Sequence, residues 1–184
     1  MRGCNPETQV PDPPLTIRRL HLLRHAKSSW DDPTRADHAR PLSTRGTKAG
    51  ERMRRWLAEN DVRPQVVVCS TAVRARETLD LVLPALGAPH VLIEAALYHA
   101  PAERLLDRVH TLPDDAGSAM LVGHNPGLER LAALLAAPGS LRDTVNDAFP
   151  TGALATLVAT AGSWRKLEPG SMSLTGLVLP RLLR

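Results

Sequence analysis

The most informative stretch of the sequence is LLRHA at residues 22–26, which closes an apolar run that begins near Ile17. A short apolar run of this kind is typical of a buried strand. It places Arg24 and His25 just past the strand end, the edge at which open α/β sheets bind their ligands. Arginine binds phosphate through a forked, permanently charged guanidinium, and histidine acts as a nucleophile or acid–base group near neutral pH. Taken alone, the stretch fits an ordinary strand end with two polar residues equally well.

Short apolar runs alternate with amphipathic segments along the rest of the chain. Strands are expected at residues 17–23, 65–69, 90–93, 119–123 and 151–159, with further strand candidates at 164–167 and at 174–179, the last as a strand or a packed tail. Helices are expected at about 43–57, 71–86, 102–110 and 126–137. The alternation predicts a layered α/β domain with a largely parallel sheet. The late run of strands predicts an antiparallel addition at one end of that sheet.

The first of these helices opens after a Pro-Leu-Ser sequence at residues 41–43. Ser43 is a good N-cap residue, because its hydroxyl can accept a hydrogen bond from a free N–H of the first turn. Residues at helical spacing on one face are Ala49, Met53, Trp56 and Leu57. Gly46 and Gly50 are expected to weaken the helix, since glycine costs about 1 kcal/mol relative to alanine in a helix interior.

A chain of 184 residues is the length of one domain. We expect a disordered leader at 1–16, because this proline-rich stretch has no apolar periodicity. The remaining residues, 17–184, are expected to form a single domain. Hydrophobic residues make up 43% of the chain, which excludes a disordered composition for the whole.

Composition and charge restrict the partners and the compartment. The net charge of +4 is mild and no block of like charge stands out, and aromatic residues, at 3%, are too scarce for base stacking, so a nucleic-acid partner is not expected. The two cysteines do not form a disulfide framework. The chain shows no apolar segment of a secretory signal and no run of the ~18 apolar residues that a membrane helix needs. We therefore expect a reduced, cytoplasmic setting without a membrane partner.

Three of the predicted strand ends carry the same kind of residue. Beside LLRHA at 22–26, the sequence CSTAVRA follows the second strand at residues 69–75, and VGHNP follows the fourth at 122–126. If these strands are parallel, all three ends meet at one edge of the sheet and bring together two arginines and two histidines. Such a set fits a doubly charged oxyanion. The helix expected from about Thr71 would add its N-terminal N–H groups.

These motifs, in this order, resemble those of the histidine phosphatase superfamily. The matching residues are LLRHA at 22–26, S-x-x-x-R-A-x-x-T at 70–78 and GHNP at 123–126. The resemblance is to the branch of the small bacterial phosphohistidine phosphatase SixA, which D-x-x-R-P-L-S-x-x-G at 37–46 also fits. It runs from about Arg19 to the C-terminus. It implies a three-layer α/β/α sandwich with a mostly parallel central sheet, of the phosphoglycerate-mutase-like kind.

The resemblance also implies roles for four residues. His25 would be the nucleophile that takes up the phosphoryl group, Arg24 and Arg74 would bind its equatorial oxygens, and His124 would hydrogen-bond the same group. Phosphoryl transfer needs mainly positioning and neutralisation of spread charge, which two guanidiniums and a second imidazole supply without a metal. For attack, one imidazole nitrogen of His25 must be free and the other held by an acceptor.

No cofactor is expected. His25 and His124 could in principle bind a metal ion, but no Cys-x-x-Cys or His-x-x-x-His spacing supports a metal site. Arg40 is expected to pair with Asp37 rather than to reach the phosphate.

The general acid is the open question. Glu94 lies in the region where many members of the superfamily place an acid for an alkoxide leaving group, but a surface carboxylate is the favoured interpretation. A weak or absent acid suits a phosphoramidate, because an imidazole leaves more readily than an alkoxide. The expected activity is hydrolysis of phosphohistidine on a phosphorylated signalling or phosphotransfer protein. Two alternatives are a phosphatase for small phosphate esters and a non-catalytic phosphate-binding module.

Overall fold

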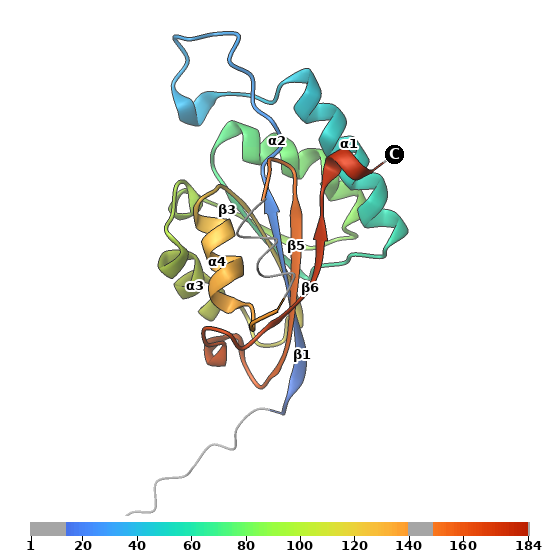
Figure 1. Ribbon diagram of the computed structural model, residues 1–184, viewed down its shortest axis with the longest axis vertical. Coiled ribbons are helices and arrows are strands. Elements are labelled where there is room, and N and C mark those ends of the chain that lie inside the picture. The colour runs from blue at the N-terminus through green and yellow to red at the C-terminus, as the bar shows by residue number, and fades with distance from the viewer. Residues whose placement is uncertain (1–13, 140–148, 184) are drawn as a thin grey trace, which may run out of the picture.

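A computed structural model describes residues 14–139 and 149–183 as a six-stranded sheet with helices on both faces (Figure 1). The strands are β1 (Thr16–Arg24), β2 (Val66–Ser70), β3 (His90–Glu94), β4 (Ser118–Gly123), β5 (Leu154–Ala161) and β6 (Ser173–Val178). The helices are α1 (Thr44–Glu59), α2 (Val73–Val82), α3 (Ala102–His110) and α4 (Gly127–Leu135). Most of the expected leader, residues 1–13, lies outside the described residues. No helix in the described ranges is long and apolar enough to cross a membrane.

The strand order is β3-β2-β4-β1-β5-β6. β1 pairs in parallel with β4, and β2 pairs in parallel with both β3 and β4. β5 runs antiparallel to β1, and β6 antiparallel to β5. The prediction of a largely parallel sheet with an antiparallel addition is confirmed.

Two hydrophobic clusters fill the layers on either side of the sheet. Leu20 and Leu22 of β1 belong to the cluster that packs against α3 and α4, whereas Leu23 belongs to the cluster that packs against α1 and α2. Side chains of a strand alternate between its two faces, so a strand buried on both sides is apolar throughout. This explains why the run before Arg24 carries no clean alternation, and the predicted three-layer sandwich is confirmed.

The C-terminal third differs from the prediction at two places. The strand expected at 151–159 begins only at Leu154, because Gly152, at φ +79°, lies in a turn before it. Residues 164–167 do not form a strand: Trp164–Lys166 is a single 3-10 turn. The fully buried Trp164 determines this turn, because its indole N–H donates to the carbonyl of Ala116 at 2.7 Å. The second candidate, 174–179, is a strand rather than a packed tail and forms β6.

Both ends of α2 also differ from the prediction. α2 begins at Val73 rather than Thr71, and it ends at Val82 because Pro84 cannot continue an α-helix and lies in a 3-10 turn. Gly87, at φ +79°, ends that turn in a left-handed conformation that glycine adopts without strain.

α1 starts as predicted, but its two glycines have a packing role that was not expected. The Ser43 hydroxyl caps the helix by accepting from the Gly46 N–H at 3.1 Å. A Cβ atom on Gly46 would lie 2.1 Å from the backbone oxygen of Lys27, and one on Gly50 would lie 2.6 Å from the side chain of Leu81. Both glycines therefore allow close packing. The sequence alone predicts only that they weaken the helix.

Candidate active site

The ends of β1, β2 and β4 lie side by side at one edge of the sheet. Arg24 is opposite Gly123 in the β1–β4 register, and Cys69 is opposite Val122 in the β2–β4 register. The residues that follow these strands are thus brought together, as the motif order predicts. The imidazole rings of His25 and His124 have centroids 5.0 Å apart.

His25 is held in one tautomer. Its Nδ1 lies 2.7 Å from the backbone oxygen of Ala26, and because a carbonyl only accepts, Nδ1 carries the proton. Its Nε2 accepts a long hydrogen bond, 3.3 Å, from Nε of Arg74. Burial and the charges of Arg74 and Arg24 lower the pKa of His25 to about 4, although the bond to Ala26 acts in the opposite direction. A neutral imidazole with its Nε2 lone pair toward the guanidinium results.

His124 is arranged the other way round. Its Nδ1 lies 3.4 Å from Nη2 of Arg74, and its Nε2 lies 2.8 Å from the hydroxyl of Ser70. Since a guanidinium only donates, Nδ1 is the acceptor and Nε2 holds the proton. Burial, with the charges of His25 and Arg74, lowers the pKa of His124 to about 3. Ser70, which the sequence motif includes without a role, thus orients the second histidine.

Arg24 has a donor to spare. Its Nη1 donates to the backbone oxygen of Phe149 at 2.7 Å, but its Nε is buried and has no hydrogen-bond partner among the described residues. Burial lowers the pKa of the guanidinium, and the charge of Glu129 partly offsets this effect. A buried guanidinium N–H without an acceptor is costly unless an anion satisfies it.

Comparison with known proteins agrees with this geometry. The sequence profile of the histidine phosphatase superfamily (branch 1) matches residues 20–98. An uncharacterized protein of Mycobacterium tuberculosis is 35% identical over 163 residues, which cover 86% of this chain and 100% of that protein. A solved structure assigned as phosphohistidine phosphatase SixA from Nakamurella multipartitia is 30% identical, with a TM-score of 0.79 over 91% of this chain and 98% of that one. The chain belongs to the histidine phosphatase superfamily.

A second SixA structure, from Agrobacterium tumefaciens, is 29% identical and has a TM-score of 0.75 over 89% of this chain and 98% of that one. The similarity to both solved structures thus extends over about nine-tenths of this chain. The SixA resemblance drawn from the motifs is confirmed.

The site of this histidine phosphatase contains a carboxylate whose position the sequence did not reveal. Asp37 accepts from Nη2 of Arg74 at 2.9 Å, from Nη1 of Arg40 at 3.0 Å and from the Tyr98 hydroxyl at 2.7 Å. Partial burial acts to raise the pKa of Asp37, but the Tyr98 bond and the Arg74 charge outweigh it and lower this pKa to about 2. The expected Arg40 pair is present. Apart from the place of Asp37 in the motif, nothing in the sequence indicates that its carboxylate contacts Arg74.

Rings from two loops border the histidine pair. Tyr98 stacks on His99 at 4.2 Å between centroids and presents its edge to His124 at 5.4 Å. His38 donates to or accepts from the Thr71 hydroxyl at 2.9 Å and lies edge-on to Tyr98. A surface position was expected for His38 and His99, and the exposed side chain of His99 agrees with it. Both residues also contribute to the rim of the site, because the loops after β1 and β3 fold over the same sheet edge.

Glu94 is not part of this cluster. It ends β3 next to Ser70, but its carboxylate forms a forked ion pair with Arg108 of α3, at 2.9 Å from both Nε and Nη2. The ion pair and a side chain that is 27% exposed fit the interpretation of Glu94 as a surface carboxylate rather than as the acid. Within residues 14–139 and 149–183, no group of three His, Cys, Asp or Glu side chains is placed to hold a metal ion.

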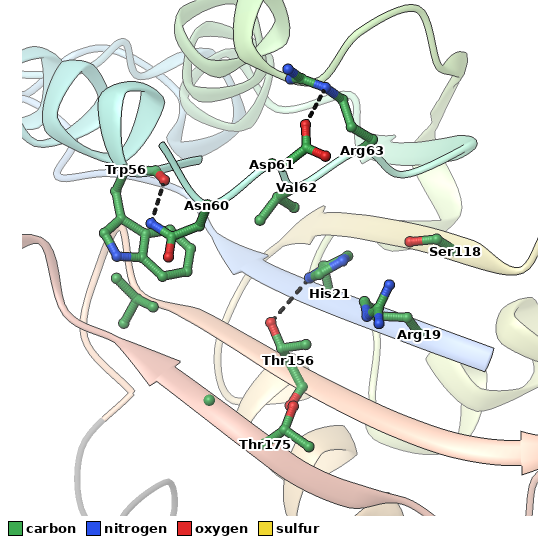
Figure 2. A pocket seen from close by; sticks show the side chains of 12 residues that line it. Arg19, His21, Trp56, Asn60, Asp61, Val62, Arg63, Ser118, Thr156 and Thr175 are labelled. Atoms are coloured by element: carbon green, nitrogen blue, oxygen red, sulfur yellow. Dashed lines mark hydrogen bonds and ion pairs between the residues drawn. The ribbon is translucent and has the colours of Figure 1, made fainter. Parts of the chain in front are cut away.

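A separate cavity of about 690 Å³ lies on the α1 side of the sheet and includes none of the predicted site residues (Figure 2). His21 of β1 lines it and bonds the Thr156 hydroxyl through Nδ1 at 3.0 Å. Burial lowers the pKa of His21 to about 4. The expected structural role of His21 fits this arrangement, since the neutral ring bonds the neighbouring strand.

Proposed function

We propose that this histidine phosphatase hydrolyses protein phosphohistidine without a metal, through a phosphohistidine intermediate on His25. The observation that carries the proposal is the tautomer of His25. Nδ1–H is held by the Ala26 carbonyl, so the lone pair of Nε2 is available beside the guanidinium of Arg74. A buried, neutral imidazole is a nucleophile that needs no base.

In the first step, the Nε2 lone pair forms a bond to phosphorus while the P–N bond of the substrate breaks. The substrate imidazole, protonated from solvent on its other ring nitrogen, keeps the electron pair of that bond and leaves as a neutral ring. In the second step, the oxygen of a water molecule attacks phosphorus, the P–Nε2 bond breaks and its electron pair returns to His25. Inorganic phosphate leaves, and the proton of the water passes to phosphate or solvent.

Arg24, Arg74 and His124 stabilise the charge that spreads over the phosphoryl oxygens. The Nε–H of Arg24, which has no partner in the described part of the chain, and the Nε–H of Arg74, which makes only a long bond to His25, are donors that a phosphoryl group can use. A dianion next to His124 raises the pKa of this imidazole from about 3. His124 then takes up a proton on Nδ1 and donates it as a hydrogen bond to a phosphoryl oxygen.

The acid–base groups favour a P–N substrate over an ester. An alkoxide leaving group needs a proton donor, and a carboxyl with a pKa of about 2, such as Asp37, is ionised at neutral pH. Glu94 is engaged by Arg108. An imidazole that already carries a proton from solvent on its other ring nitrogen leaves as a neutral ring and needs no donor from the protein. The two similar structures assigned as SixA phosphohistidine phosphatases support the same substrate class.

The test measures phosphate release from a histidine-phosphorylated protein and from a panel of phosphomonoesters, with EDTA present. The wild type is expected to act faster on phosphohistidine and to form an acid-labile phosphoenzyme, and both properties are expected to be lost in His25→Ala. His90→Ala is the matched control, because His90 is exposed at the start of β3, at the opposite edge of the sheet. Preference for an ester would replace the substrate class, and release that survives His25→Ala would refute the mechanism.

A further inference from the structure

A second group of cations lies at the sheet edge that holds the candidate active site. Lys27, Arg45, Arg52 and Arg181 line a cavity of about 320 Å³. They come from three segments: the residues after β1, helix α1, and the 3-10 turn Pro180–Leu182 after β6. Arg45 and Arg52 are seven residues apart and so lie on one side of α1. We call these four residues the basic pocket.

The charges of the basic pocket are not neutralised within the described chain. All four side chains are exposed, none forms a hydrogen bond or ion pair with another described residue, and no described residue lining the cavity is acidic. Some other arginines of this chain are paired, for example Arg18 with Asp114, Arg40 with Asp37 and Arg108 with Glu94. Four like charges around one cavity repel each other, and an anionic ligand removes that cost.

The basic pocket is joined to the nucleophile by backbone hydrogen bonds. Pro150 and Thr151 line the cavity, and the N–H of the next residue, Gly152, donates to the backbone oxygens of Arg24 at 3.1 Å and His25 at 3.0 Å. Arg74 and His124 approach His25 from the β2–β4 side, whereas the basic pocket lies on the β5–β6 side of β1. In Figure 1 the C-terminal turn lies against α1 at the end of the sheet toward which β1 points. A polypeptide with its phosphohistidine at His25 can thus extend over the basic pocket.

We propose that the basic pocket docks an acidic segment of the phosphorylated protein substrate, next to the phosphohistidine. The inference rests on the proposed function. Exposed cations on separate segments suit a run of carboxylates on a polypeptide, because each charge can pair with a different side chain. Such rim charges act on encounter and on KM more than on the chemical step, and salt screens them.

The test uses two peptides of equal length, each phosphorylated on a single histidine that is flanked by glutamates in one and by glutamines in the other. For the wild type at low salt, kcat/KM is expected to be about tenfold higher for the glutamate peptide. Arg52→Glu is expected to reduce this preference to about twofold or less, with kcat/KM for the glutamine peptide unchanged. Arg181→Glu, on another element, is expected to do the same.

The matched control is Arg54→Glu, which changes the charge equally on the same helix. Arg54 is exposed but lies about 200° around α1 from Arg52 and does not line the cavity. It is expected to keep the preference. Preference retained in both Arg52→Glu and Arg181→Glu, equal loss on both peptides, or equal loss in Arg54→Glu would refute the docking surface. A wild type that hydrolyses neither peptide but hydrolyses an ester would instead refute the proposed function.

Discussion

Nη2 of Arg74 lies 2.9 Å from Oδ2 of Asp37, and Nε of the same guanidinium lies 3.3 Å from Nε2 of His25. A single arginine thus connects a carboxylate from the loop before α1 to the proposed nucleophile. The Arg74 side chain is 5% exposed and the Asp37 side chain 43% exposed, so the pair sits where the buried floor of the site meets solvent. The carboxylate fixes the direction of the guanidinium before any phosphate arrives.

The first prediction concerns this pair. Asp37→Asn is expected to lower kcat/KM for a phosphohistidine substrate by about tenfold, because an amide replaces a charge-assisted bond that orients Arg74. The measurement is steady-state kinetics. Asp32→Asn is the control, because its carboxylate lies in the same loop but, among the described residues, bonds Thr34 and Arg35 and no residue of the site. An Asp37→Asn enzyme with higher kcat/KM would show that the carboxylate competes with phosphate instead of orienting the arginine.

Glu94 provides the second prediction. Glu94→Gln is expected to leave kcat for phosphohistidine unchanged and to lower the free energy of unfolding by about 0.5–1 kcal/mol, the usual range for a partly exposed ion pair. Urea unfolding measures the second effect, and Arg108→Gln is expected to match it, since it removes the other half of the pair. A large loss of kcat in Glu94→Gln with Arg108→Gln fully active would assign Glu94 the acid role.

The sequence was sufficient for residues whose position follows from a strand end. Arg24, His25 and His124 lie directly after apolar runs, and parallel pairing brings such ends to one edge whatever the loops do. Asp37 and Tyr98 could not be placed in this way. They lie in irregular loops, and the bond between them joins residues 61 positions apart, so only the folded loops bring them to Arg74.

A comparable limit explains the error at residues 164–167. A short apolar segment is read as a strand, but here one fully buried indole with a hydrogen-bond acceptor in a distant loop decides the conformation. Propensity is local, whereas the Trp164–Ala116 contact is not.

Gly46 provides the third prediction. Gly46→Ala improves the helix propensity by about 1 kcal/mol, yet its Cβ would lie 2.1 Å from the Lys27 oxygen, a contact that must be relieved by moving backbone. We therefore expect a net destabilisation of about 2 kcal/mol or more, seen as a lower midpoint of thermal unfolding. Gly176→Ala is the control, because nothing lies within 4 Å of the Cβ position there. Equal midpoints for the two variants would show that the loop after β1 yields easily.

The last prediction concerns pH. Burial keeps His21, His25 and His124 neutral in the folded chain, with pKa values of about 4, 4 and 3, whereas the ordinary value is 6.5. Below pH 6.5 the unfolded chain therefore binds more protons than the folded one, so stability is full above this pH and is lost as the pH falls toward the folded values. In that pH window, each such histidine lowers the free energy of unfolding by about 1 kcal/mol for each unit by which the pH falls.

Urea unfolding at a series of pH values from about 7 to about 5 measures the slope of the free energy of unfolding against pH. Substitution of single histidines assigns the contribution of each one to this slope. His21→Gln is expected to reduce the slope by the share of one proton while leaving catalysis intact, because His21 contacts Thr156 in a cavity separate from the site. His90→Gln, at an exposed position, is expected to leave the slope unchanged. A wild-type stability that does not fall between these pH values would mean that the three imidazoles titrate in the folded chain as they do in the unfolded chain, with pKa values of about 6.5. Burial would then not keep Nε2 of His25 neutral below this pH, and the proposed attack would be lost as the pH falls through that value.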